Sequence, residues 1–122
     1  MTYEIVPQDG FVEVHVSGKV SHWDLLKIVH ALHKKDPKKE TPDLWILDQD
    51  LDFSLHAFPT IIQGLLNLVA RGAVKKGCKS AILAADKFQC AKVDIYCAEA
   101  AVLPYEIRAF TCRTETMDWL LS

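Results

Sequence analysis

The sequence predicts an α/β fold with a mixed, mostly parallel sheet of about five strands and four helices. Two short apolar runs, around Trp45 and Ile82, are bounded by polar residues. This pattern is typical of strands that are buried on both faces of a parallel sheet. Stretches with apolar residues at helical spacing separate the runs, and parallel strands need such crossover connections. We therefore expect the order β-β-α-β-α-β-α-β-α, in a single domain that spans residues 1–122.

The amino-terminal segment predicts a β-hairpin followed by a helix. Residues 3–6 and 11–16 are rich in β-branched and aromatic residues, and the turn signal Asp9-Gly10 lies between them. A helix then begins at Ser21, which has Asp24 three residues later. This spacing is that of a capping box, which satisfies free backbone N–H groups at a helix start.

The middle of the chain predicts a buried strand, an acidic loop and a second helix. Residues 44–47 form the apolar strand, and Asp48 begins the loop. Pro59 opens the helix, because proline is well tolerated in a first turn. Gly72 or Gly77 is expected to end it. The apolar stripe of this helix consists of Ile61, Ile62, Leu65, Leu66 and Val69.

The carboxyl-terminal third predicts a helix, a strand and a final helix. Asp86 begins the first of these helices and Pro104 ends it. Residues 106–110 form the last strand, and Thr114 is expected to cap the final helix. The first helix has one apolar face, made of Phe88, Ala91, Ile95, Ala98 and Val102.

Composition and charge argue against several classes of protein. The 122 residues include 14 Lys and Arg against 16 Asp and Glu, a net charge of −2, whereas nucleic-acid binding usually needs a basic face. No apolar run approaches the roughly 20 residues of a membrane span, and no signal peptide is recognised. The four cysteines lack CxxC spacing and lie in or beside apolar stretches, as reduced cysteines do. We expect a cytoplasmic protein.

Three features of the chain point beyond the fold class. The strand at 11–16 ends in Ser17-Gly18, the buried strand at 44–47 is followed by Asp48, and residues 107–110 lead into a short helix ending in Trp119-Leu120. With the order of elements, they resemble the SpoIIAA-like superfamily, which holds the STAS domains and a STAS/SEC14-like set of small bacterial proteins. The resemblance covers nearly the whole chain. It implies a SpoIIAA-like fold and a domain that binds a partner protein or, in some members, a nucleotide or lipid.

The resemblance also raises the question of a phosphorylation switch. Several STAS domains are switched at a serine that starts the second helix, in an Asp-Ser motif followed shortly by glycine. Here the corresponding residues 50–55 contain no glycine, and their hydroxyl is that of Ser54. Asp50 and Asp52 would repel a phosphate, and the nearest basic residue downstream is Arg71. We therefore predict that Ser54 is no phosphosite and is at most a helix cap or a hydroxyl at a pocket rim.

In open α/β sheets, ligands gather beyond the carboxyl ends of the strands. Polar residues there either bind a ligand or merely cap helices and solvate loops. The surface that we predict to bind a ligand or partner consists of Asp48, Asp50, Asp52, Phe53, Ser54, Leu55, His56, Phe58, Ile62 and Asp86.

Catalytic and metal-binding interpretations of the chain lack supporting residues. Aspartates at alternate positions offer oxygen ligands for Mg²⁺ or Ca²⁺, but the loop departs from the EF-hand pattern. A Mg-dependent phosphotransferase with Asp48 as nucleophile and Asp50 as general acid is a remote alternative, since its lysine and distal acidic pair are not evident. His30 and His33 share a helix face but need a third metal ligand. We expect no enzymatic activity, no metal and no cofactor.

The apolar stretch of residues 53–66 is longer than one core face requires. It forms an interface with a partner or a second copy, lines a small apolar pocket, or is simply a well-buried helix. Two functional hypotheses follow. The first is a non-enzymatic binding or regulatory domain that engages a partner protein or itself. The second is a carrier of a small apolar or amphipathic ligand.

Overall fold

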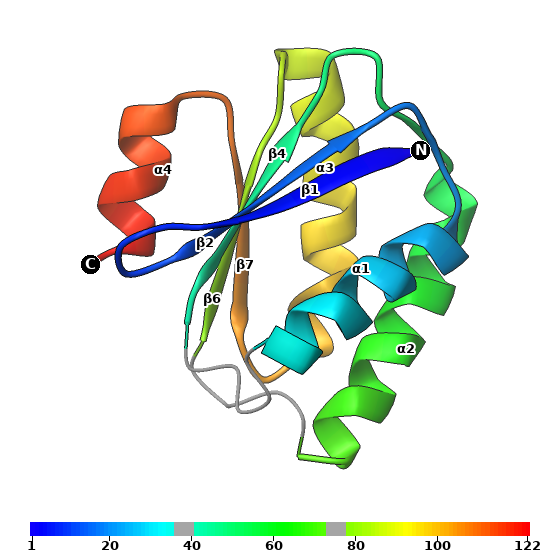
Figure 1. The fold of residues 1–122 in the computed structure, drawn as a ribbon. Helices are drawn as coiled ribbons and strands as arrows, with labels where there is room; N and C mark the ends of the chain where they lie inside the picture. The colour runs from blue at the N-terminus through cyan, green and yellow to red at the C-terminus, as the bar shows by residue number, and fades with distance from the viewer. Residues whose placement is uncertain (36–40, 73–77) are drawn as a thin grey trace.

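The computed structural model describes residues 1–35, 41–72 and 78–122, which are arranged around a five-stranded sheet (Figure 1). The strand order is β1-β2-β4-β6-β7. β1 pairs antiparallel with β2, and every other pair is parallel. The predicted mixed, mostly parallel sheet is therefore confirmed. The strands are β1 (Thr2–Pro7), β2 (Val12–Ser17), β4 (Asp43–Leu47), β6 (Lys79–Leu83) and β7 (Glu106–Phe110).

The β1–β2 hairpin forms at the predicted turn. Gly10 has a φ of +83°, a left-handed conformation that glycine adopts without strain. The N–H of Gln8 donates to the carbonyl of Phe11 at 2.9 Å. Beside the main sheet, β3 (Lys19–Val20) and β5 (Asp52–Phe53) form a two-stranded parallel sheet. Strands of two residues carry too little pattern to be predicted from sequence.

Three helices cover one face of the sheet and a fourth covers the other, as Figure 1 shows. Among the described residues, α4 alone covers that face, and the four predicted helices are present. Among the described residues, no helix is both long and apolar enough to cross a membrane. The helices are α1 (His22–Lys35), the 3₁₀ helix η1 (Leu55–Ala57), α2 (Phe58–Ala70), α3 (Lys87–Glu99), the 3₁₀ helix η2 (Ala100–Val102) and α4 (Arg113–Leu120).

Alternate residues of each strand face the two helical layers. Val14 of β2 packs with Ile28 of α1, on the face covered by three helices. Leu44 of β4 and Ala81 of β6 pack with Leu120 of α4, on the opposite face. The sheet therefore separates two apolar layers, as the buried strand runs predict.

The N-terminal caps of the helices agree with the predictions at two helices and differ at one. Ser21 and Asp24 form the capping box: the N–H of Ser21 donates to Asp24 Oδ2 at 3.0 Å, and the N–H of Asp24 donates to Ser21 Oγ at 3.2 Å. Asp86 caps α3 by accepting the backbone N–H three residues ahead at 2.7 Å. The prediction for Thr114 is wrong. The N-cap of α4 is Cys112, and Thr114 lies inside the first turn.

The ends of α2 agree with the proline and glycine signals. Pro59 lies in the first turn of the helix. The helix ends at Ala70, and Gly72 follows with a φ of +72°. Gly77, the alternative end, lies outside the described residues.

The apolar face that the sequence pattern indicates on the third helix is not the face that packs on the sheet. Phe88, Ile95 and Val102 are 76%, 46% and 67% exposed, whereas Gln89 and Val93 are buried. Periodicity shows that an apolar stripe exists. It does not show which side the sheet covers when a helix has apolar residues on two sides, as α3 does.

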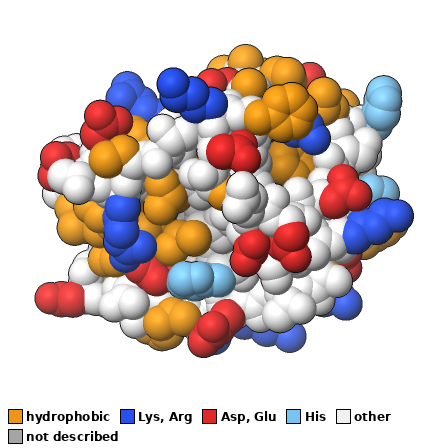
Figure 2. Space-filling model, turned by 90° about the horizontal axis from the view of Figure 1, so that it is seen from above, with side chains coloured by type: hydrophobic (Ala, Val, Ile, Leu, Met, Phe, Trp, Pro, Cys, Tyr) orange, Lys and Arg blue, Asp and Glu red, His pale blue; other side chains and the backbone are white. Residues whose placement is uncertain are grey.

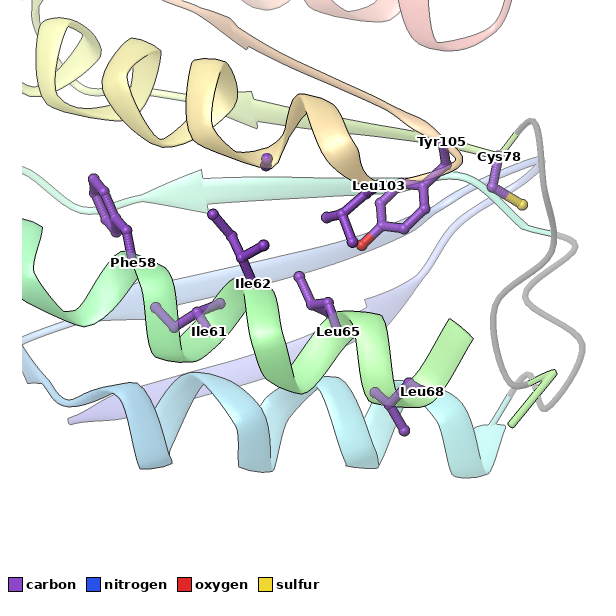
Figure 3. Packing of buried hydrophobic residues seen from close by; sticks show 9 residues of the cluster. Phe58, Ile61, Ile62, Leu65, Leu68, Cys78, Leu103 and Tyr105 are labelled. Atoms are coloured by element: carbon purple, nitrogen blue, oxygen red, sulfur yellow. The ribbon is translucent and has the colours of Figure 1, made fainter. Parts of the chain in front are cut away.

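The largest core cluster is built around α2 (Figure 3). Figure 3 shows Phe58, Ile62 and Leu65 on α2 turned toward the sheet, with Leu103 and Tyr105 approaching from the segment before β7. The apolar stripe of the second helix therefore faces the interior. The buried members of this cluster are Phe58, Ile61, Ile62, Leu65, Leu68, Cys78, Ala100, Leu103 and Tyr105.

Candidate functional site

The acidic residues at the carboxyl ends of the parallel strands hydrogen-bond to nearby backbone. Oδ1 of Asp48 accepts the N–H of Asp50 at 3.2 Å, and Oδ1 of Asp50 accepts the N–H of Gly18 at 3.4 Å. Asp52 belongs to β5, where its backbone lies opposite that of Lys19 in the parallel pair with β3. Figure 2 views this end of the molecule, where acidic side chains lie scattered among basic and hydrophobic ones. The aspartates form turns and a short strand rather than one acidic patch.

Gln89, which the sequence analysis did not single out, joins two of these strand ends. Its side chain is buried in the first turn of α3. Nε2 donates to the carbonyl of Asp48 at 2.9 Å, and Oε1 accepts the N–H of Ala85 at 2.7 Å. A glutamine at the start of a helix carries no sequence signal for this role, because both partners are backbone atoms.

The metal and phosphotransferase interpretations gain no support from this geometry. Within residues 1–35, 41–72 and 78–122, no group of three or more His, Cys, Asp or Glu side chains is placed to hold a metal ion. His30 is exposed, whereas His33 is half-buried. The contacts of Asp48 and Asp50 fit turn formation better than a nucleophile and its general acid.

Ser54 lies at the N-cap of η1, as the cap interpretation predicts. Its Oγ accepts the N–H of His56 at 3.2 Å. Ser54 and His56 are both exposed, and so is Leu55 between them. The serine therefore stabilises a turn that leads into α2.

An apolar cavity of about 410 Å³ lies between the sheet and the three helices on one face. It extends from Phe53, near the carboxyl ends of the parallel strands, to Thr41, near their amino ends. Small-molecule pockets in proteins measure roughly 300–1,000 Å³ and are lined mainly by apolar and aromatic side chains. The size and lining of this cavity therefore fit a small apolar ligand. Its apolar walls include Val16, Leu25, Val29, Trp45, Leu65, Ile82 and Val93.

Polar side chains are a minority in the lining, and one of them has an unsatisfied atom. Nδ1 of His33, near the carboxyl end of α1, is buried without a hydrogen-bond partner in the part of the chain that the structure describes. Tyr96 and Tyr105 also line the cavity. Both phenols are protonated at neutral pH, and burial raises their pKa further above the ordinary value of 10.0. An unpaired buried nitrogen such as His33 Nδ1 is costly.

The predicted surface and the cavity overlap at two residues. Phe53 and Phe58 line the cavity, and Ile62 is buried in the adjoining cluster. Sequence reasoning considered His33 as a metal ligand and missed its place in the lining. The available signal was its position four residues after Val29, in register with the apolar stripe of α1. The predicted residues that do not line the cavity are Asp48, Asp50, Asp52, Ser54, Leu55, His56, Ile62 and Asp86.

Comparison with known proteins bears on the fold. No family model matches the chain, and no curated protein matches it. The structure is similar to the crystal structure of an uncharacterised protein of the DUF3478 family, with a SpoIIAA-like fold, from Shewanella loihica PV-4. The TM-score is 0.57, and the sequences are 23% identical over 98% of this chain and 92% of that one. The chain has a SpoIIAA-like fold. This confirms the fold that the resemblance implies, while a SpoIIAA-like fold does not by itself assign a function.

Proposed function

We propose that this SpoIIAA-like domain binds a small apolar or amphipathic molecule in the cavity between its helices and the sheet. The observation that carries the proposal is the cavity itself, with a volume of about 410 Å³ and mainly apolar walls. Of the two hypotheses drawn from the sequence, the cavity supports the carrier.

Leaving apolar walls of this extent in contact with water is energetically unfavourable. Each Å² of apolar surface removed from water contributes about 25 cal/mol to stability. Water is a poor occupant, because apolar walls offer it few hydrogen-bond partners. An apolar ligand gains about 0.8 kcal/mol for each methylene group that it buries, which favours a resident ligand.

His33 supports an amphipathic ligand over a purely apolar one. Its buried Nδ1 is unsatisfied among the described residues, beside walls that are otherwise mainly apolar. Nδ1 is covered by protein atoms, so a hydroxyl or carboxyl group at one end of the ligand would pair with it after a rotation of the His33 ring toward the cavity. His33→Leu is then expected to weaken the binding of a fatty alcohol more than that of an alkane of equal chain length. An equal loss of affinity for the two ligands would show that His33 does not bind the polar end of the ligand.

Titration of the ligand-stripped protein, refolded from denaturant, with the fluorescent apolar probe ANS tests ligand binding with a matched pair of variants. Val29→Phe fills the cavity from α1, whereas His30→Phe adds the same ring to an exposed position of the same helix. We expect saturable binding to the wild-type protein, about tenfold weaker binding to Val29→Phe, and unchanged binding to His30→Phe. Circular dichroism checks that both variants fold. Absence of saturable binding, or equal binding by the two variants, would contradict the proposal.

Partner binding through residues 53–66, the first hypothesis, has less support. Phe58, Ile62 and Leu65 are buried in the core cluster and are not available to a partner. Leu55 is exposed, but a single exposed leucine is ordinary on a protein surface. A protein contact has better support on the outer face of α3.

A further inference from the structure

The outer face of α3 and η2 carries a row of exposed apolar side chains. Phe88, Ile95 and Val102 are exposed, and Ala91 and Ala98 between them are exposed as well. Successive members are three or four residues apart, which is the spacing of an apolar seam between paired helices. Single exposed apolar residues need no explanation, whereas a contiguous row indicates a contact surface. We call this row the α3 seam.

The α3 seam is not the side with which α3 packs on its own chain. α3 contacts β7 and α2, and the side turned to them carries Gln89, Val93 and Tyr96. At 3.6 residues per turn, the two sides lie roughly 140° apart around the helix. No element of the described chain covers the seam, because its large members remain exposed.

We infer that a second copy of this chain covers the α3 seam, through antiparallel pairing of the two α3 helices about a two-fold axis. In a two-fold interface the same patch serves both partners, so the patch must be self-complementary. The α3 seam alternates larger and smaller residues. Ile95 then packs against Ala98 of the second copy, and Val102 packs against Ala91 of the second copy. Phe88 lies beyond the paired segment in this register. Pairing large with small residues lets the helices interlock without voids.

Charges beside the α3 seam select this register. Lys92 and Glu99 lie next to the seam, on the same side of it. In the inferred register, Lys92 of each copy faces Glu99 of the other. A shift of one heptad also matches large with small residues, but it places Lys92 opposite Lys92 and Asp94 opposite Asp94, which repel. The ammonium of Lys92 lies 5.5 Å from the centroid of the Phe88 ring and 5.4 Å from that of the Phe53 ring, so in the dimer it must turn from Phe53 to reach Glu99 of the second copy.

Sedimentation equilibrium tests the inferred dimer, which does not depend on the cavity or its ligand. We expect the wild-type protein to dimerise at concentrations up to roughly 100 µM. Ile95→Glu is expected to raise the dimer Kd by more than about 100-fold, since it places two carboxylates in the seam. Trp23→Glu on α1 replaces another exposed apolar residue and is the matched control, with an unchanged Kd. Circular dichroism verifies the fold of each variant.

A charge exchange tests the register. Lys92→Glu and Glu99→Lys are each expected to weaken the dimer about tenfold, because like charges then face each other. The double variant is expected to recover the wild-type Kd, because both ion pairs form again with reversed sign. A wild-type protein that stays monomeric, a dimer that tolerates Ile95→Glu, or a double variant as weak as the single ones would overturn the inference.

Discussion

Arg113→Met is expected to loosen α4 from the sheet by leaving Glu13 without its main partner. Glu13 lies on β2, and its side chain is 7% exposed. Nη2 of Arg113 donates to Oε1 of Glu13 at 2.5 Å, and Nε2 of His15 lies 3.0 Å from Oε2. Burial on its own would raise the pKa of Glu13, but the hydrogen bonds with Arg113 and His15 outweigh burial and lower it. The pair therefore holds the start of α4 against β2.

The magnitude follows from the surroundings of the pair. A hydrogen bond to a charged group contributes about 1.5–3 kcal/mol. The Arg113 side chain is 53% exposed, so solvent screens the interaction and partly hydrates the carboxylate left behind. We expect the free energy of unfolding to fall by about 2 kcal/mol at neutral pH. For a domain of this size, such a loss lowers the Tm by about 6–12 °C.

The loss of stability caused by Arg113→Met is expected to be larger at neutral pH than at acid pH. Because the pKa of Glu13 is lowered in the fold, its stabilisation is complete above the ordinary value of 4.5 and disappears as the pH falls through the lowered value. Urea denaturation is therefore expected to show the full loss at about pH 7 and little of it at about pH 3. Asp118→Asn, an exposed position of α4, is the control and changes stability by less than about 0.5 kcal/mol. An equal loss for Arg113→Met at both pH values would refute this reasoning.

Three further substitutions test other contacts. Gly64→Ala places a methyl group 2.5 Å from Leu26 Cδ2, where α1 and α2 meet. Because Leu26 Cδ2 is the end of a flexible side chain, and alanine favours a helix interior over glycine by about 1 kcal/mol, we expect the free energy of unfolding in urea to change by less than about 1 kcal/mol, and a loss above about 2 kcal/mol would contradict this packing. Ser54→Ala is expected to cost about 1 kcal/mol or less and to leave ANS binding unchanged, so weaker binding would argue against a pure cap. Gln89→Ala is expected to cost about 1–2 kcal/mol and to speed hydrogen exchange at the Ala85 N–H in NMR spectra, and unchanged exchange would refute the link between the strand ends.

The elements that could be predicted from the sequence are those with local signals. The turn at Gly10, the capping box at Ser21 and the cap at Asp86 each follow from a few neighbouring residues. The paired strands of two residues are too short to produce a pattern. The cap at Thr114 was misplaced by two residues, because the N-cap residue Cys112 makes no side-chain capping hydrogen bond.

The candidate site was harder to predict, because the cavity is a product of tertiary packing. The sequence indicates which polar residues follow the strands, and the structure shows that Asp48 and Asp50 hydrogen-bond to nearby backbone. The cavity depends on how closely α1, α2 and the sheet approach each other, which no local pattern specifies. His33 of α1 and Ile107 of β7 both line it, from elements that are distant in the sequence. Likewise, periodicity identifies one apolar side of α3, whereas the sheet covers the side that carries Gln89 and Val93.

Native mass spectrometry of the protein as purified tests the proposed carrier function most directly. We predict a species heavier than the 13.7 kDa chain by the mass of one bound molecule per chain, and loss of the added mass under denaturing conditions. The bound fraction is expected to fall in Val29→Phe and to persist in His30→Phe, because only the first substitution fills the cavity. The same spectra report whether the chain is a monomer or a dimer. Detection of the ligand-free mass alone, across independent preparations, would contradict the proposal that this cavity carries a ligand.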